Sequence, residues 1–293
     1  MNLTLTVLEI VAPVFLLAGV GFTWVKLGFE YRLQFVTRLA MTLAVPCLIF
    51  VALMQTEIDR AALGRFTLAG IAGYGALTVV FMLIVKALRL ERRTFLAPLI
   101  FGNTGNLGVP LCLFAFGPEG LGYAIVMLAL SVVYSFTYGI YLVAGRGSVL
   151  KIMREPMVWA TLAGAVFLWQ GWQTPRFLTD TLDLIGQMAI PLMLITLGVA
   201  VARLTPGRII QAIVLSALKV ALCALIGWGV GWMFDLGPTA LGVLVLELAM
   251  PVAVTSYLLA EKYGADAESV AGMVVISTLM AVASLPVLLG LLL

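Results

Sequence analysis

Apolar stretches of bilayer-spanning length alternate with short polar breaks along the whole chain. Each stretch holds about 20 residues with few charges, the pattern of a transmembrane helix. Ten such spans are predicted near 5–25, 36–54, 66–88, 94–116, 121–144, 157–173, 182–202, 208–234, 238–260 and 268–292. The breaks between them are too short for a separate soluble domain. The predicted fold class is therefore an all-α membrane protein.

Helix breakers interrupt two of these spans. The fourth contains Gly102-Asn103-Thr104-Gly105-Asn106-Leu107-Gly108-Val109-Pro110, and Pro110 lacks the amide that would bond the carbonyl of Asn106. In the ninth span Glu247 stands four residues before Pro251, as Asn106 stands to Pro110. Unpaired backbone persists at membrane depth only where protein buries it or water reaches it. We therefore expect helices 4 and 9 to be broken and to form a binding site.

The two halves of the chain resemble each other. Ala44-Val45-Pro46 corresponds to Ala189-Ile190-Pro191, and Arg65, Pro110 and Gly117 correspond to Arg208, Pro251 and Gly264. A few matches among common residues can arise by chance, but prolines in consistent order favour a true repeat. Each half holds five spans, so equivalent helices must point in opposite directions. We predict two inverted five-helix repeats, 1–147 and 148–293.

Composition and charge support this interpretation. The chain is 63% hydrophobic and 11% charged, which excludes an ordinary soluble domain. With the predicted spans, thirteen Lys and Arg residues fall on one face and three on the other. The positive-inside rule then places both termini on the non-cytoplasmic side. Histidine is absent and no Asp lies deep inside a predicted span, so an enzyme is not expected, nor is a resident metal or cofactor.

The first broken span offers the main candidate ligands. Asn103, Thr104 and Asn106 carry donors and acceptors that can bind a carboxylate, a hydroxyl or a cation. Alternatively, they pair with the carbonyls that the break frees and only hold the kink. After Pro251, the hydroxyls of Thr255 and Ser256 fit a site or a structural role equally well.

Two charged side chains fall deep inside predicted spans. A carboxylate such as Glu247 is costly there, so we expect it to bind Na⁺ or take up a proton in a transport cycle. A structural pair with Lys219, or a hydrogen bond to freed backbone, is the alternative. Lys219 could neutralise an anionic substrate, although snorkelling or pairing with Glu247 fits it better.

The two breaks favour an anionic substrate. A helix that resumes after a break directs its positive end toward the middle of the membrane. With amides nearby, a small solute that bears a carboxylate is the natural ligand. A channel would need a continuous polar lining, which the spans lack. A receptor for organic acids that uses the same fold stays open as an alternative.

These residues resemble the auxin efflux carrier family, whose bacterial members include transporters of malate and malonate, within the bile, arsenite and riboflavin transporter-like group. The resemblance covers nearly the whole chain. Its most specific parts are the motif at 102–110 and Met250-Pro251-Val252-Ala253-Val254, followed by Leu259-Ala260-Glu261-Lys262-Tyr263-Gly264-Ala265-Asp266.

The resemblance implies that helices 4 and 9 cross at Pro110 and Pro251, with substrate bound near the crossing. Spans 1, 2, 6 and 7 would form a scaffold in a homodimer, and spans 3–5 and 8–10 would carry a small mono- or dicarboxylate across the inner (plasma) membrane like an elevator. A sodium- or proton-coupled symporter of a larger amphipathic anion is the alternative. The chain has Thr255 where relatives often have Asn, and its connection near 145–155 is short.

Overall fold

The computed structural model describes residues 3–55, 58–144, 156–204 and 208–293 of the chain. Across these residues the secondary structure is helical, apart from one isolated β-bridge. Six helical stretches are long and apolar enough to cross a membrane, and three shorter apolar helices accompany them. The predicted all-helical membrane fold is confirmed. The short connection expected near 145–155 lies outside the described residues.

In the described residues before 145, the structure has seven helices and three π-helical turns. They are α1 (Leu3–Lys26), α2 (Leu33–Leu39), η1 (Ala40–Ala44), α3 (Val45–Gln55), α4 (Arg60–Ala87), α5 (Arg92–Ile100), η2 (Thr104–Gly108), α6 (Val109–Tyr134), η3 (Ser135–Gly139) and α7 (Ile140–Ala144). Gly117 kinks α6 because its backbone is left-handed, with φ of 64° and ψ of −155°. Two shorter helices therefore follow each other within α6.

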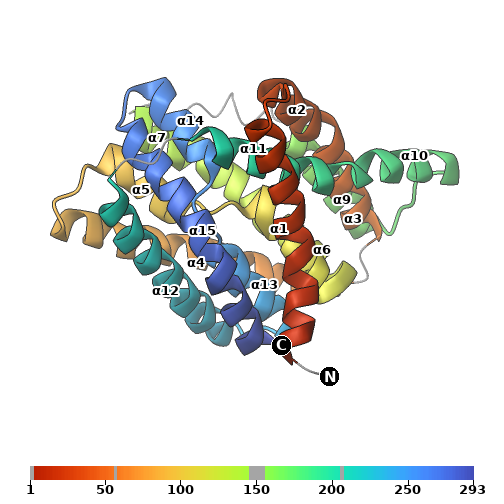
Figure 1. Ribbon diagram of the computed structural model, residues 1–293. Helices are drawn as coiled ribbons and strands as arrows, with labels where there is room; N and C mark the ends of the chain where they lie inside the picture. Colours follow the sequence, from red (N-terminus) through yellow and green to blue (C-terminus); the bar gives the residue numbers. More distant parts are fainter. Residues whose placement is uncertain (1–2, 56–57, 145–155, 205–207) are drawn as a thin grey trace.

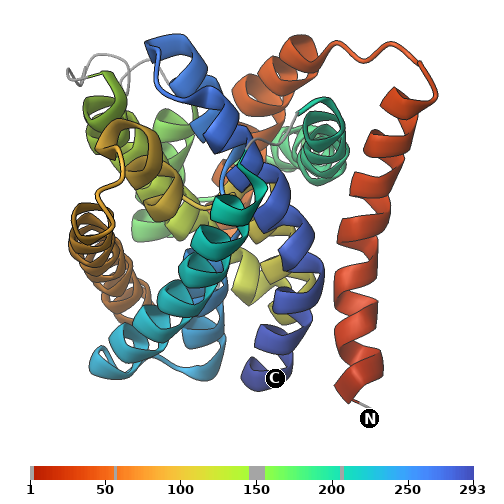
Figure 2. The same cartoon turned by 60° about the vertical axis from the view of Figure 1, so that its left-hand side comes forward.

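In the described residues from 156 onward, the structure has seven helices. They are α9 (Pro156–Gln170), α10 (Arg176–Gln187), α11 (Ala189–Arg203), α12 (Ile209–Met233), α13 (Pro238–Ala249), α14 (Val254–Tyr263) and α15 (Ala267–Leu292). The start of α1 and the end of α15 lie at the same end of the molecule (Figures 1 and 2). An even number of membrane crossings would produce this arrangement.

The helices pack as two groups. In one group α1 lies along α11, and α3 packs against α9 and α10; in the other, α12 packs against α13, α15 and α4. Figure 2 shows α1 at one edge of the molecule, with α11 beside it and α4 and α12 on the far side. Helices α5, α13 and α14, which flank the two interruptions, pack with the second group. Helix α6, which follows the first interruption, contacts helices of both groups.

Small residues bring α1 and α11 close together. A Cβ added to Gly198 would collide with the carbonyl of Ala18, and one added to Gly21 would collide with the carbonyl of Ile195. Close backbone approach of this kind is how helices associate in lipid, where apolar side chains gain little from leaving the hydrocarbon.

The first interruption differs from the prediction. The backbone leaves the helix only at Phe101, Gly102 and Asn103, and helical structure resumes at Thr104. Pro110 is therefore the second residue of α6 and not the point at which the chain breaks. The π-helical turn η2, one residue wider than an α-helical turn, precedes this proline, and η1 precedes Pro46 in the same way. The wider turn accommodates a ring that has no amide to donate.

The close contact of α1 and α11 generates a prediction. Gly21→Val should lower the free energy of unfolding by about 1–3 kcal/mol, because a side chain there overlaps the backbone of α11. Gly19→Val is the matched control, since no atom lies within 4 Å of a Cβ at that position. Thermal denaturation in detergent measures both variants. Equal melting temperatures for the two would contradict the proposed packing.

Candidate functional site

The two interruptions meet and pair through their backbones. Gly102 and Val252 form an antiparallel β-bridge. The amide of Asn103 donates to the carbonyl of Pro251 at 2.7 Å, and that of Ala253 donates to the carbonyl of Phe101 at 3.4 Å. Each interrupted helix thus provides the hydrogen-bond partner for a polar backbone group of the other.

Local sequence explains why the two interrupted segments approach so closely. A Cβ at Gly102 would lie 2.9 Å from Cβ of Met250, so only glycine fits at the bridge. The amide of Val252 also donates to the hydroxyl of Ser277 on α15, at 2.9 Å. Beside the first interruption, the ring of Phe101 packs against that of Tyr134, with centroids 5.6 Å apart. These contacts hold both broken segments in place.

A cavity of about 370 Å³ opens beside the paired segments. Four of the predicted substrate ligands line it, namely Asn103, Thr104, Asn106 and Thr255. Pro110, Pro251 and Ser256 are buried and do not line it. The cavity is also lined by Thr37, Met41, Phe101, Gly102, Gly105, Leu128, Ser131, Val132, Ser135, Met157, Ala253, Val254 and Leu259.

Two side-chain amides at the cavity have unused hydrogen-bonding capacity. The Nδ2 donor of Asn103 and the Oδ1 acceptor of Asn106 are buried and have no partner in the described part of the chain. Buried polar atoms are normally paired, and each exception needs a reason. Asn103 Nδ2 is the one donor of this pair, and it does not donate to a carbonyl that the break frees.

Glu247 lies in the interior of the protein, away from this cavity. Its side chain is fully buried on α13, and the thiol of Cys112 is 3.7 Å from Oε1. The carboxylate lies against Gly108, where a Cβ would be 2.5–2.7 Å from its three terminal atoms. Its Oε2 atom has no hydrogen-bond partner among the described residues. Glu247 thus contacts the helix that starts at the first interruption without reaching the ligand cavity.

Lys219 does not pair with Glu247, contrary to one expectation. Its side chain is fully buried, so it does not snorkel either. Nζ donates to the backbone carbonyl of Leu99 at 2.9 Å, in the last turn of α5 before the first interruption. A cation is favourable there, because the carbonyls at a helix C-terminus carry partial negative charge. Lys219 therefore caps the first half of the broken helix.

Several lining residues could not be found from sequence. Thr37, Ser131 and Ser135 line the cavity from three different helical stretches. A single Ser or Thr in an apolar helix usually bonds its own backbone, so its presence does not indicate a site. Among the described residues, no group of three His, Cys, Asp or Glu side chains is placed to hold a metal ion.

Comparison with known proteins identifies the family. The model of the family described as "Membrane transport protein" matches residues 6–155 and 146–289. The chain belongs to this family. It is the family that the resemblance to auxin efflux carriers indicated, and its members are membrane transporters and not enzymes.

Two relatives show how far the similarity extends. A protein of Methanothermobacter thermautotrophicus, named "Uncharacterized transporter", is 27% identical over an alignment 308 positions long, which spans 95% of this chain and 96% of the relative. A protein of Rhizobium meliloti, named "Putative malonate transporter", is 24% identical over 273 residues, which cover 83% of this chain and 81% of the relative. This transporter is thus an integral multi-pass membrane protein similar to them over most of its length.

The packing of Glu247 on the broken helix can be tested. Gly108→Ala should lower the free energy of unfolding by about 1–3 kcal/mol, because the methyl group would overlap the buried carboxylate. Gly105→Ala is the matched control one turn away, where a Cβ would lie 3.4 Å from the Leu128 side chain, an ordinary contact. Thermal denaturation of the purified variants measures the difference. A Gly108→Ala variant as stable as Gly105→Ala would contradict the described contact.

Proposed function

We propose that the protein is a secondary active transporter of a small organic anion, a mono- or dicarboxylate, that works by elevator-type alternating access. The observation that carries this proposal is the pairing of the two interrupted helices beside a cavity with unpartnered amides. In transporters, broken helices that meet inside the membrane commonly form the substrate site.

The polarity of the cavity supports an anion. Helical structure begins at Thr104 after one interruption and at Val254 after the other, and both residues line the cavity. The free amides at these helix starts attract negative charge. Among the described residues, no Asp or Glu lines the cavity, so a carboxylate meets no fixed charge of its own sign from this part of the chain.

The size of the cavity supports a small solute. A volume of about 370 Å³ is at the lower end of the range for small-molecule sites, roughly 300–1,000 Å³. The relative named as a malonate transporter is consistent with a substrate of this size. The apolar residues Met41, Phe101 and Met157, which also line the cavity, favour the alternative of a larger amphipathic anion carried with Na⁺ or H⁺.

An inverted repeat would explain alternating access, and the backbone supports one. Six of the seven described residues with positive φ form pairs that occupy similar places in the two halves, 143, 146 and 147 residues apart. These pairs are Gly28 with Gly171, Arg89 with Asp235, and Gly117 with Gly264. We propose that 1–147 and 148–293 are two five-helix repeats, which together give ten spans.

The position of the cavity supports an elevator. Thr37, Met41 and Met157 belong to α2, η1 and α9, in the proposed scaffold of spans 1, 2, 6 and 7. The ligands at the two interruptions belong to the proposed transport part, spans 3–5 and 8–10. Because the cavity lies between the two groups, sliding one past the other would move a bound substrate relative to the membrane.

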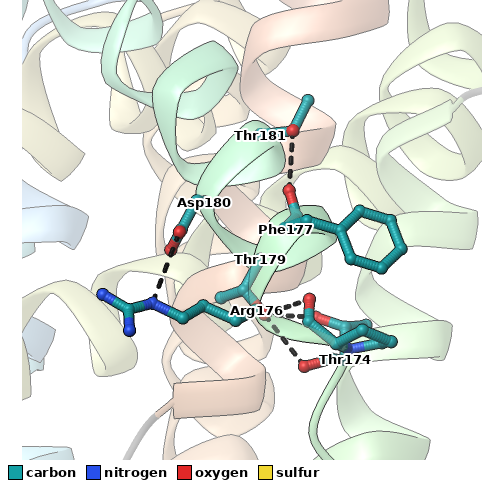
Figure 3. Close-up of polar contacts among 7 residues, drawn as sticks. Thr174, Arg176, Phe177, Thr179, Asp180 and Thr181 are labelled. Atoms are coloured by element: carbon teal, nitrogen blue, oxygen red, sulfur yellow. Dashed lines mark hydrogen bonds and ion pairs between the residues drawn. The ribbon is translucent and has the colours of Figure 1, made fainter.

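We propose that the scaffold forms a homodimer. Helix α10 projects from the molecule, and Phe177 and Leu184 on it are 75% and 68% exposed (Figure 1). Figure 3 shows its polar contacts, among them the 3.7 Å ion pair of Arg176 with Asp180. A helix that exposes both charges and large apolar side chains suits a protein interface better than lipid.

The charge distribution further supports an inner-membrane orientation with both termini on the non-cytoplasmic side. A screen of purified protein by thermal shift against small mono- and dicarboxylates, with and without sodium, tests the substrate class. Saturable counterflow of the stabilising solute in proteoliposomes would then distinguish a transporter from a pore. Large conductance without counterflow would contradict the proposal.

Removal of one cavity amide should slow transport strongly while the protein stays folded. Asn106→Ala should slow uptake of the stabilising carboxylate by about tenfold or more, since hydrogen bonds to charged groups contribute roughly 1.5–3 kcal/mol. Gln170→Ala is the control, because Gln170 is an exposed residue at the end of α9 that does not line a cavity. Rates in proteoliposomes with equal protein content measure the effect. Near-normal transport by Asn106→Ala would refute the site assignment.

A buried carboxylate beside the moving helix should act in coupling. We propose that Glu247 takes up the coupling cation, H⁺ or Na⁺, and that Lys219 supports this role from α12. Glu247→Gln should change the pH or sodium dependence of transport while the Kd for the substrate stays within about threefold, because Glu247 does not touch the cavity. Transport and binding are measured over pH and sodium series. Unchanged dependence on both would rule out the coupling role.

A further inference from the structure

A second, wider cavity of about 730 Å³ adjoins the cavity at the interruptions. The two share five lining residues, namely Thr37, Met41, Asn106, Val254 and Thr255. They therefore form one continuous space that runs outward from the paired segments between α2 and α11. The wider part is also lined by Leu33, Gln34, Phe35, Arg38, Ala40, Met193, Thr196 and Ala200.

One described residue gives this space a full charge. Among the described residues that line the two cavities, Arg38 is the only Lys, Arg, Asp or Glu. It lies in the last turn of α2, next in sequence to Thr37, which lines both cavities. Arg38 is exposed and forms no ion pair in the described part of the chain. Its positive charge is thus not compensated by a neighbouring carboxylate.

We propose that Arg38 is a specificity-determining residue that selects substrates by their negative charge. This inference rests on the proposed transport of organic anions and adds the residue that ranks them. An unpaired guanidinium that lines the path raises the local concentration of anions, and its planar donors fit a carboxylate in two-point contact. The neutral amides at the interruptions carry only partial charges, so they distinguish one negative charge from two more weakly than a guanidinium does.

The chemistry makes a quantitative distinction between substrates. Coulomb energy is proportional to the charge of the ligand, so the same arginine favours a dianion about twice as strongly, in free energy, as a monoanion. When the charge of Arg38 is removed, the fold-increase in Kd for a dicarboxylate should therefore be the square of that for a monocarboxylate. A threefold loss of affinity for a monocarboxylate corresponds to about a ninefold loss for a dicarboxylate. Arg38 thereby biases the site toward dicarboxylates.

The proposed elevator gives this bias a direction. Arg38 belongs to the scaffold, whereas Asn106 and Thr255 belong to the part that would move. The arginine therefore acts on the bound anion in the conformation described here. It follows that affinity for a dicarboxylate is higher on the membrane face to which the wider cavity leads, the face that the charge distribution assigns to the cytoplasm.

Equilibrium binding in detergent tests the proposal without dependence on membrane orientation. Malonate, a dianion near pH 7.5, and propionate, a monoanion, are titrated against the parent, Arg38→Gln and Arg38→Lys at low and high salt. We expect Arg38→Gln to weaken propionate about threefold and malonate about ninefold at low salt, with smaller losses at high salt because screening shortens the reach of the charge. Arg38→Lys should retain most of the affinity for both.

Arg32→Gln is the matched control. Arg32 is exposed near the start of α2, but it pairs with Glu30 at 2.7 Å and does not line either cavity. Its removal should leave both affinities within about twofold of the parent.

The outcomes separate the two proposals. Equal losses for propionate and malonate in Arg38→Gln would indicate a structural effect and overturn the charge-selection role, as would unchanged binding of both. A parent protein that binds neither anion would overturn the proposed function, and the role of Arg38 with it.

Discussion

Two backbone hydrogen bonds, from Asn103 to Pro251 and from Ala253 to Phe101, are the contacts on which the rest of the site depends. They satisfy polar groups that the interruptions would otherwise leave unpaired at membrane depth, where each would cost several kcal/mol. Separating the segments would expose those groups again. The backbone pairing therefore holds the two broken helices together at the site.

The all-helical membrane fold and the presence of two special segments were predictable because both are local properties of sequence. Apolar length indicates a span, and Gly102, Pro110 and Pro251 mark places where a helix is weakened. The exact point of the first interruption was not predictable. It depends on the pairing of Gly102 with Val252, 150 residues later, which fixes the break before the proline instead of at it.

The candidate site was predictable to the same degree. Asn103, Thr104, Asn106 and Thr255 lie at the breaks themselves, and all four line the cavity. Thr37, Arg38 and Ser131 come from helices whose position depends on tertiary packing, and no local pattern singles them out. The partner of Lys219 was missed for a related reason: sequence suggests the nearest opposite charge, whereas in the structure a carbonyl at a helix end provides the negative partner.

Arg89, Arg208 and Asp235 adopt left-handed backbone, with φ of 53°, 45° and 49°, which costs free energy for any residue that has a Cβ. All three lie at helix ends and none lines either cavity. The fold therefore stores strain at connections between helices, outside the proposed route of the solute. Glycine at these positions would relieve it, so the connections offer a way to obtain a more robust protein for biophysical work without altering the transport pathway.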